Sequence, residues 1–281
     1  MKKARRRKLQ LVFWLCVATA GLWVAFAPPL PVRVVPSARV KVELPPLAEE
    51  PLPKEPEIER PGQMLIAVVI DDLGLDIRDT RRAINLPPQV TLAFLPYATR
   101  LKEQARDARN HGHELLLHMP MEPMGRADPG PGALLTGLPQ DELQRRLEVG
   151  LASFTGFDGV NNHMGSKFTA DAAGMDLVMK ELQQRSLFFL DSRTSTQSVG
   201  EQTARQYGLA TIGRDVFLDD DGTLPAIRKQ IEQAEHIARR KGHAVVIGHP
   251  HPTTLEALES WLPDAEARGF RFVPVRELAK P

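Results

Sequence analysis

The feature that most constrains this fold is a regular alternation, after Gly62, of short apolar stretches with longer amphipathic ones. The apolar stretches read MLIAVVID, VTLAFLP, HELLLHM, GVNNHM, LFFLD, DVFLD, AVVIGH and FRFVPV. Between them, apolar residues recur at helical spacing over residues 78–84, 101–110, 140–154, 170–185, 225–241 and 254–268. Apolar strands that alternate with helices are typical of a parallel sheet buried on both faces. The sequence therefore predicts an α/β fold, an irregular (β/α) barrel of about seven strands.

The part of the chain before this alternation has a different character. Six of the first eight residues are basic, and residues 11–27 carry no charge. An apolar segment of this length behind a basic flank indicates a transmembrane helix. A cleaved signal peptide is the alternative, because AFA at residues 25–27 resembles a cleavage site, although Pro28 and Pro29 follow it. Residues 28–62 are rich in proline, which favours an extended linker.

These segments predict four parts. They are a basic cytoplasmic N-terminus (1–10), a transmembrane signal-anchor (11–27), a Pro-rich linker (28–62) and an exported globular domain (63–281). Lys and Arg number 36 against 35 Asp and Glu, so no excess of positive charge indicates a nucleic-acid partner. The single cysteine, Cys16, lies in the apolar segment, so the exported domain has neither a disulfide nor a thiolate metal site.

Asp and His residues stand at the carboxyl ends of five predicted strands. In chain order they are Asp71 and Asp72, His118, His163, Asp191, and His249 with His251. Chemistry in folds of this kind gathers at the carboxyl ends of the strands, so these residues are expected at one rim. One such residue is more often a turn former or a helix cap, but five strands repeating the pattern indicate a site. The other histidines are expected to be solvated: His111, His113, His236 and His243.

The chemistry of these residues indicates a metal site. One Asp with two His and no thiolate suits Zn²⁺, or a similar divalent ion, with an open coordination position. The adjacent carboxylates Asp71 and Asp72 fit a division of labour, in which one binds the metal and the other takes a proton from water. Helix capping, with Gly74 in the turn, is the alternative, and it explains one carboxylate but not two.

Four motifs resemble those of the polysaccharide deacetylases. IDD, GHELLLH, a strand ending in Asp and a late GHPH occur in the order of that family, and IDDLG, HMPME, NNHMGS and DSRTS are similar to its divergent bacterial branch. The resemblance covers about residues 64–278. It implies a barrel of about seven βα units, a divalent metal and a carbohydrate substrate. It also implies roles for five residues: Asp71 as general base, Asp72 and His118 as metal ligands, and His249 as general acid oriented by Asp191.

The sequence departs from the pattern of ordinary members at two points. Glu122 stands where they have a second metal-binding histidine, four residues after the first, and an Arg-Pro-Pro-Tyr type of motif is missing. His163, in NNHMGS, is the predicted third ligand, positioned by the two asparagines before it, with Glu122 as a second candidate. Arg193 is expected either to meet a substrate carboxylate or to pair with Asp191, and His251 is a further possible site residue.

The resemblance and the N-terminal segments together predict a function. We expect a metal-dependent hydrolase that removes N-acetyl or O-acetyl groups from an envelope carbohydrate or glycoconjugate, held on the periplasmic side of a bacterial inner membrane by residues 11–27. The alternative, supported by the missing arginine motif, is a catalytically inactive metal- or glycan-binding envelope protein on the same fold. The oligomeric state is left open.

Overall fold

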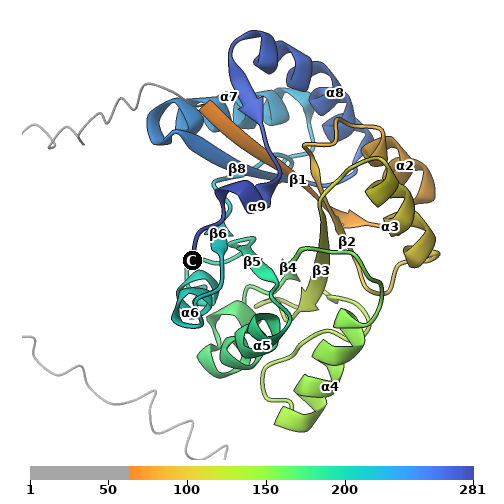
Figure 1. Ribbon diagram of the computed structural model, residues 1–281, viewed down its shortest axis with the longest axis vertical. Coiled ribbons are helices and arrows are strands. Elements are labelled where there is room, and N and C mark those ends of the chain that lie inside the picture. Colours follow the sequence, from red (N-terminus) through yellow and green to blue (C-terminus); the bar gives the residue numbers. More distant parts are fainter. Residues whose placement is uncertain (1–63) are drawn as a thin grey trace, which may run out of the picture. The chain divides into compact units, whose positions relative to one another are not determined.

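A curled sheet of parallel strands forms the centre of residues 64–281, the part of the chain that the computed structural model describes (Figure 1). Its strands are β1 (Met64–Leu73), β2 (Thr91–Phe94), β3 (Leu115–Met121), β4 (Gly159–Met164), β5 (Phe188–Asp191), β6 (Thr211–Gly213), β7 (Val216–Phe217), β8 (His243–Gly248) and β9 (Phe270–Phe272). They follow the order β6, β5, β4, β3, β2, β1, β8, β7, while β9 pairs with the start of β1. Every ladder is parallel.

The predicted parallel α/β architecture is confirmed, with more strands than expected. All eight apolar stretches contain a strand, and the short β6 comes in addition, so the described sheet has nine strands rather than about seven. Within residues 64–281 no pairing joins β6 to β7, so the sheet curls like part of a barrel without closing.

Helices cover the outside of the curl, except α9, which lies on its inner side (Figure 1). They are α2 (Ile77–Ile84), α3 (Leu101–Asn110), α4 (Gln140–Leu151), the 3₁₀ turn η1 (Phe168–Ala170), α5 (Ala172–Gln184), α6 (Gly200–Gln206), α7 (Leu224–Lys241), α8 (Pro252–Ala267) and α9 (Val275–Leu278). The six predicted helices are confirmed to within a few residues at each end. The helices α6 and α9 were not predicted, because seven and four residues are too few to show a helical period.

Two apolar cores lie on the two sides of the sheet, because successive side chains of a strand point to opposite faces. Along β1, Ile66, Val68 and Ile70 pack outward against the helices. Ala67 and Val69 point inward, into a smaller core that α9 helps to fill. This alternation decides which residues near the strand ends face the inside of the curl.

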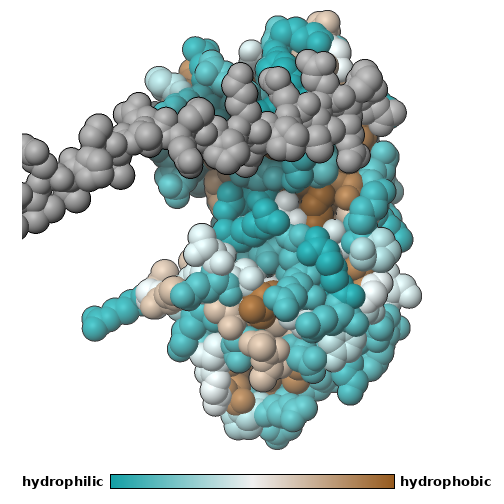
Figure 2. All heavy atoms as spheres, turned by 90° about the vertical axis from the view of Figure 1, so that its left-hand side faces the viewer, coloured by the Kyte–Doolittle hydropathy of each residue, from teal (hydrophilic) through white to brown (hydrophobic). Residues whose placement is uncertain are grey.

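The N-terminal predictions concern residues that this structure does not describe. The signal-anchor at 11–27 and the linker at 28–62 both lie before Met64. Among the described residues, none of the helices has the length and apolar character needed to cross a membrane. The face of the molecule in Figure 2 is largely hydrophilic, with scattered hydrophobic residues.

Candidate metal centre and acid–base pair

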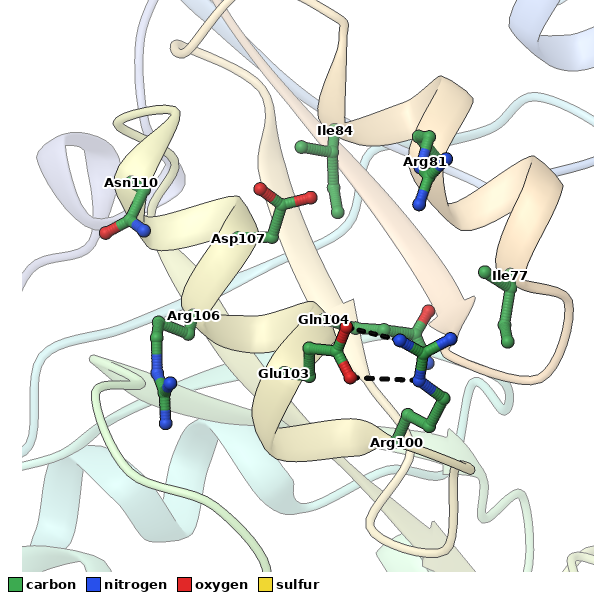
Figure 3. A pocket seen from close by; sticks show the side chains of 9 residues that line it. All are labelled: Ile77, Arg81, Ile84, Arg100, Glu103, Gln104, Arg106, Asp107 and Asn110. Atoms are coloured by element: carbon green, nitrogen blue, oxygen red, sulfur yellow. Dashed lines mark hydrogen bonds and ion pairs between the residues drawn. The ribbon is translucent and has the colours of Figure 1, made fainter.

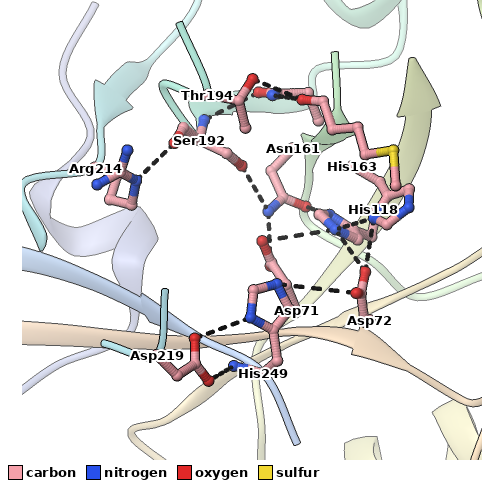
Figure 4. A network of polar contacts seen from close by, with 12 residues as sticks. Asp71, Asp72, His118, Asn161, His163, Ser192, Thr194, Arg214, Asp219 and His249 are labelled. Atoms are coloured by element: carbon pink, nitrogen blue, oxygen red, sulfur yellow. Dashed lines mark hydrogen bonds and ion pairs between the residues drawn. The ribbon is translucent and has the colours of Figure 1, made fainter. Parts of the chain in front are cut away.

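The carboxyl ends of the strands bring the candidate residues together at the inner face of the curl. Asp71 continues the inward series of Ala67 and Val69 on β1. By the same alternation, His118 follows Leu116 on β3, and His249 follows the inward residues of β8. Asp71 and His118 are each 2% exposed. The predicted convergence of these strand ends is therefore observed (Figure 4).

Asp72 reaches the same site by a break in the strand pattern. Strict alternation would turn it outward, next to the helices. Its φ of 58° lies in the left-handed region, and the pairing of β1 with β2 shifts register between Ile70 and Leu73. Met164, the last residue of β4, and Arg193, two residues after β5, have φ values of 51° and 47°. Non-glycine residues in this conformation cost free energy and cluster at functional sites.

Asp72, His118 and His163 form a compact group of three potential metal ligands. Asp72 Oδ1 lies 2.7 Å from His163 Nδ1 and 3.2 Å from His118 Nε2, and the two nitrogens are 3.3 Å apart. Ligands at about 2.1 Å from a tetrahedral ion are about 3.4 Å from one another, so this spacing fits one shared cation. Asp72 Oδ1 is buried and accepts no hydrogen bond within the described residues. The donor set and the orphaned oxygen both fit a divalent metal.

Asn161 determines which nitrogen of His118 is available to a metal. Its amide Nδ2 donates to Asp71 Oδ1 at 2.8 Å, and a carboxylate oxygen can only accept. Asn161 Oδ1 is therefore the acceptor toward His118 Nδ1, at 2.9 Å. The proton of neutral His118 then sits on Nδ1, and the lone pair of Nε2 points toward Asp72 and His163. Such support for a ligating histidine is common in metal sites.

His249 is held by Asp219, which corrects the prediction that Asp191 orients it. Asp219 Oδ1 lies 3.0 Å from His249 Nδ1, while its Oδ2 accepts from the backbone N–H of His249 at 2.7 Å and from Thr254 at 2.8 Å. Asp191 follows Phe189, which packs outward, so its carboxylate points away from His249. It accepts instead from Ser198 Oγ at 2.7 Å.

Asp219 was not among the predicted residues, although a signal for it existed. The stretch DVFLD ends in Asp219 just as LFFLD ends in Asp191. Asn161 and Asn162 were expected to position His163. Asn161 instead contacts Asp71 and His118, and Asn162 donates to the backbone of Met164.

The electrostatics give the two aspartates different roles. Burial raises the pKa of Asp71, although His118, His249 and the Asn161 hydrogen bond act in the opposite direction. For Asp72, burial acts upward, but the nearby ring nitrogens and charge of His118 and His163 hold its pKa well below the usual range. Asp72 thus remains an anion, as a metal ligand requires, and Asp71 is the better proton acceptor.

The pKa of His249 is raised to about 9. Burial alone would lower it, but the hydrogen bond and charge of Asp219 offset this, with help from Asp72 and Asp71. His249 is therefore protonated at neutral pH and can donate a proton.

The three further predicted possibilities lie outside the metal ligand group. Glu122 accepts from Thr136 and forms an ion pair with Lys167 at 2.7 Å, so its carboxylate is already satisfied. The guanidinium of Arg193 pairs with Glu201 at 2.6 Å and not with Asp191. His251 is exposed at the start of α8, with its ring centroid 5.8 Å from that of His249.

A separate pocket of about 320 Å³ lies between α2 and α3 (Figure 3). Its lining includes the Arg100–Glu103 ion pair and Ile77, and none of the residues of the metal ligand group. The pocket is therefore distinct from the site at the strand ends.

The fold and the site together define a parallel α/β protein in which a cluster of one aspartate and two histidines lies beside a His249–Asp219 pair. Comparison with known proteins gives the family. The sequence pattern described as divergent polysaccharide deacetylase matches residues 68–279. The chain belongs to this family, as its motifs predicted.

Similar proteins support the assignment. An uncharacterized protein of Haemophilus influenzae is 34% identical over 201 residues, 72% of each chain. The uncharacterized protein YibQ of Escherichia coli is 37% identical over 194 residues, 69% of this chain and 61% of that protein. The crystal structure of the uncharacterized protein ATU2773 from Agrobacterium tumefaciens superposes with a TM-score of 0.74 at 35% identity, covering 76% of this chain and 88% of that one.

Proposed function

We propose that this chain is an exported, metal-dependent deacetylase that removes N-acetyl or O-acetyl groups from an envelope carbohydrate. Family membership supports the reaction class and the carbohydrate substrate. The observation that carries the proposal is that a candidate base and a candidate acid both border the Asp72–His118–His163 cluster. Asp71 Oδ2 lies 3.6 Å from His118 Nε2, and His249 Nε2 lies 3.8 Å from Asp72 Oδ2.

Asp72, His118 and His163 would hold the metal. Two nitrogens and one carboxylate oxygen, with no thiolate, form a ligand set typical of catalytic zinc, which leaves a coordination position open. A divalent ion bound there supplies a Lewis acid that polarises the acetyl carbonyl and makes water more acidic. The Asn161 contact keeps His118 in the tautomer that this requires.

Asp71 and His249 would move the protons. Asp71 accepts a proton from the attacking water, whose oxygen forms the new bond to the acetyl carbon. The C–N bond then breaks, and His249 Nε2 donates its proton to the departing amine. Acetate and a free amino sugar result. Asp219 keeps the His249 ring in place through Nδ1 and favours its protonated form.

We further propose that residues 11–27 anchor the chain in a bacterial inner membrane, with the catalytic domain in the periplasm. The basic flank and the uncharged segment support this orientation. Fusion of alkaline phosphatase after residue 62 tests it, because that enzyme is active only after export. An active fusion is expected, and an inactive but stable fusion would contradict the topology.

Acetate release tests the reaction. The full-length chain, loaded with zinc, is incubated with N-acetylglucosamine oligomers and with O-acetylated glycans. Asp71→Asn and His249→Ala are expected to lower the rate by about 10²–10⁴-fold each, because each removes one proton-transfer group. His236→Ala, an exposed histidine on α7, is the matched control and keeps the rate. A zinc-loaded wild type that releases no acetate from either substrate would refute the proposal and favour a binding protein.

A further inference from the structure

Arg214 is a partly buried cation beside the site without a carboxylate partner. It lies in the short connection between β6 and β7. Its Nε donates to the carbonyl of Ser192 and its Nη2 to the carbonyl of Arg193, both at 2.7 Å. Carbonyl groups orient the guanidinium without neutralising its charge. Among residues 64–281, no Asp or Glu side chain forms an ion pair with it.

The guanidinium lies close to the proposed general acid. It stacks over Phe217, with its central carbon 4.5 Å from the ring centroid. Phe217 in turn stacks on His249, with ring centroids 5.4 Å apart and planes inclined by 24°. A planar series of Arg214, Phe217 and His249 thus leads from the cation to the group that donates a proton to the departing amine (Figure 4 shows Arg214 and His249).

The charge of Arg214 is poorly compensated. Burial lowers its pKa, and the neighbouring Arg193 lowers it further, against the weaker attraction of Asp191, Asp71 and Asp215. A partly desolvated cation without a carboxylate partner costs stability, and an anionic ligand would offset this cost.

Arg193 offers a contrast on the same rim. Its guanidinium pairs with Glu201, which it shares with Arg205, and donates from Nη1 to the carbonyl of Arg214. Arg214, and not Arg193, therefore has charge and N–H groups available for a ligand. The carbonyls of Ser192 and Arg193 take up Nε and one N–H of Nη2, and the edge formed by Nη1 and the other N–H of Nη2 matches a carboxylate in two-point geometry.

The geometry points to Arg214 as the contact for a carboxylate of the carbohydrate, on the side of the departing amine. This inference rests on the proposed function, because that function places the amine next to His249. The site would then prefer an N-acetylated sugar linked to an acidic sugar over a neutral N-acetylated oligomer. The carboxylate can belong to the sugar ring, as in a uronic acid, or to a lactyl ether, as in a muramic acid.

Binding measurements test the inference without turnover. Calorimetry measures the binding of three tetrasaccharides to the full-length Asp71→Asn variant loaded with zinc. One is a neutral N-acetylglucosamine tetramer. The two acidic ones alternate N-acetylglucosamine with glucuronate or with N-acetylmuramate. At least one acidic ligand is expected to bind about tenfold more tightly than the neutral one, as for a hydrogen bond to a charged group. The tighter of the two identifies the source of the carboxylate.

Two further substitutions separate charge recognition from structural support. Arg214→Gln is expected to abolish the preference while changing the affinity for the neutral tetramer by less than about twofold. Arg271→Gln removes an equal charge opposite Leu65, at the far end of β1, and is expected to keep the preference. Equal loss of all three ligands in Arg214→Gln would indicate a structural role and overturn the inference. So would equal binding of acidic and neutral ligands, no binding of any ligand, or a preference that survives Arg214→Gln.

The binding measurements and the acetate assay can fail independently of each other. A preference for acidic ligands in a protein that releases no acetate refutes the proposed reaction and leaves the carboxylate contact standing. Acetate release without a preference refutes only the carboxylate contact.

Discussion

Replacing Asp219 with asparagine is expected to lower the pKa of His249 most of the way back to the ordinary value for histidine. The Asp219 side chain is fully buried, and both of its oxygens accept hydrogen bonds, from His249 twice and from Thr254. Asparagine has one oxygen and one NH₂ group, so it places a donor against a donor at one of these contacts. It also removes the negative charge that favours the imidazolium.

The structure gives the size of the effect. Raising the pKa of His249 from 6.5 to about 9 corresponds to about 3 kcal/mol in favour of its protonated form. Because the folded pKa is raised, this stabilisation is fully present below about pH 6.5 and is lost as the pH rises through about 9. Asp219→Asn is therefore expected to lower the free energy of unfolding by about 2 to 3 kcal/mol more at pH 6 than at pH 10.

The direct assay is a titration of the ¹⁵N-labelled histidine rings by NMR in metal-free protein, with His249→Ala to assign the signal. The expected pKa is about 9 in the wild type and below about 7 in Asp219→Asn. Asp191→Asn is the matched control, since Asp191 points to the other side of the sheet, and it is expected to leave the titration unchanged. A pKa that stays near 9 in Asp219→Asn, or that falls in Asp191→Asn, would refute the assignment of the pair.

Three other outcomes are expected. Asn161→Ala should weaken zinc binding about 10- to 100-fold, measured by competition with a chelator, because His118 loses the partner that fixes its tautomer; unchanged affinity would show that Asn161 does not support the ligand. Gly159→Ala should lower the free energy of unfolding in urea by about 1 to 3 kcal/mol, because an added Cβ would lie 2.6 Å from the ring and 2.8 Å from the carbonyl oxygen of Phe188; a stability equal to wild type would contradict this packing. Zinc at 100 times its dissociation constant should stabilise the wild type by about 2.7 kcal/mol and His163→Ala far less, a difference visible in the melting temperature. Equal stabilisation of both would place the metal elsewhere.

The sequence predicts the strands and the polar residues at their ends, but not the face of the sheet to which each of these side chains points. Both faces of this sheet are apolar, so β5 and β7 show no polar alternation that would tell which face a terminal Asp occupies. Asp191 and Asp219 end similar apolar stretches, and only the register of the strands shows that Asp219 points inward. Resemblance to ordinary deacetylases therefore led to the wrong partner for His249.

Two other features needed the three-dimensional structure. The inward direction of Asp72 depends on its left-handed backbone conformation at the register shift between β1 and β2. No residue type in the sequence predicts this conformation. His113 was expected in solvent but is fully buried, with its ring nitrogens 2.7 Å and 2.9 Å from the carbonyl oxygens of Val90 and Ile84. Its partners are distant in sequence, so spacing along the chain does not reveal them.

Zinc stoichiometry of the purified full-length chain, by elemental analysis after loading and gel filtration, tests the central claim most directly. The wild type and His236→Ala should each bind about one zinc, and Asp72→Ala, His118→Ala and His163→Ala should each lose it while remaining folded by circular dichroism. A folded wild type without zinc would contradict the metal centre, as would full zinc content in all three ligand variants.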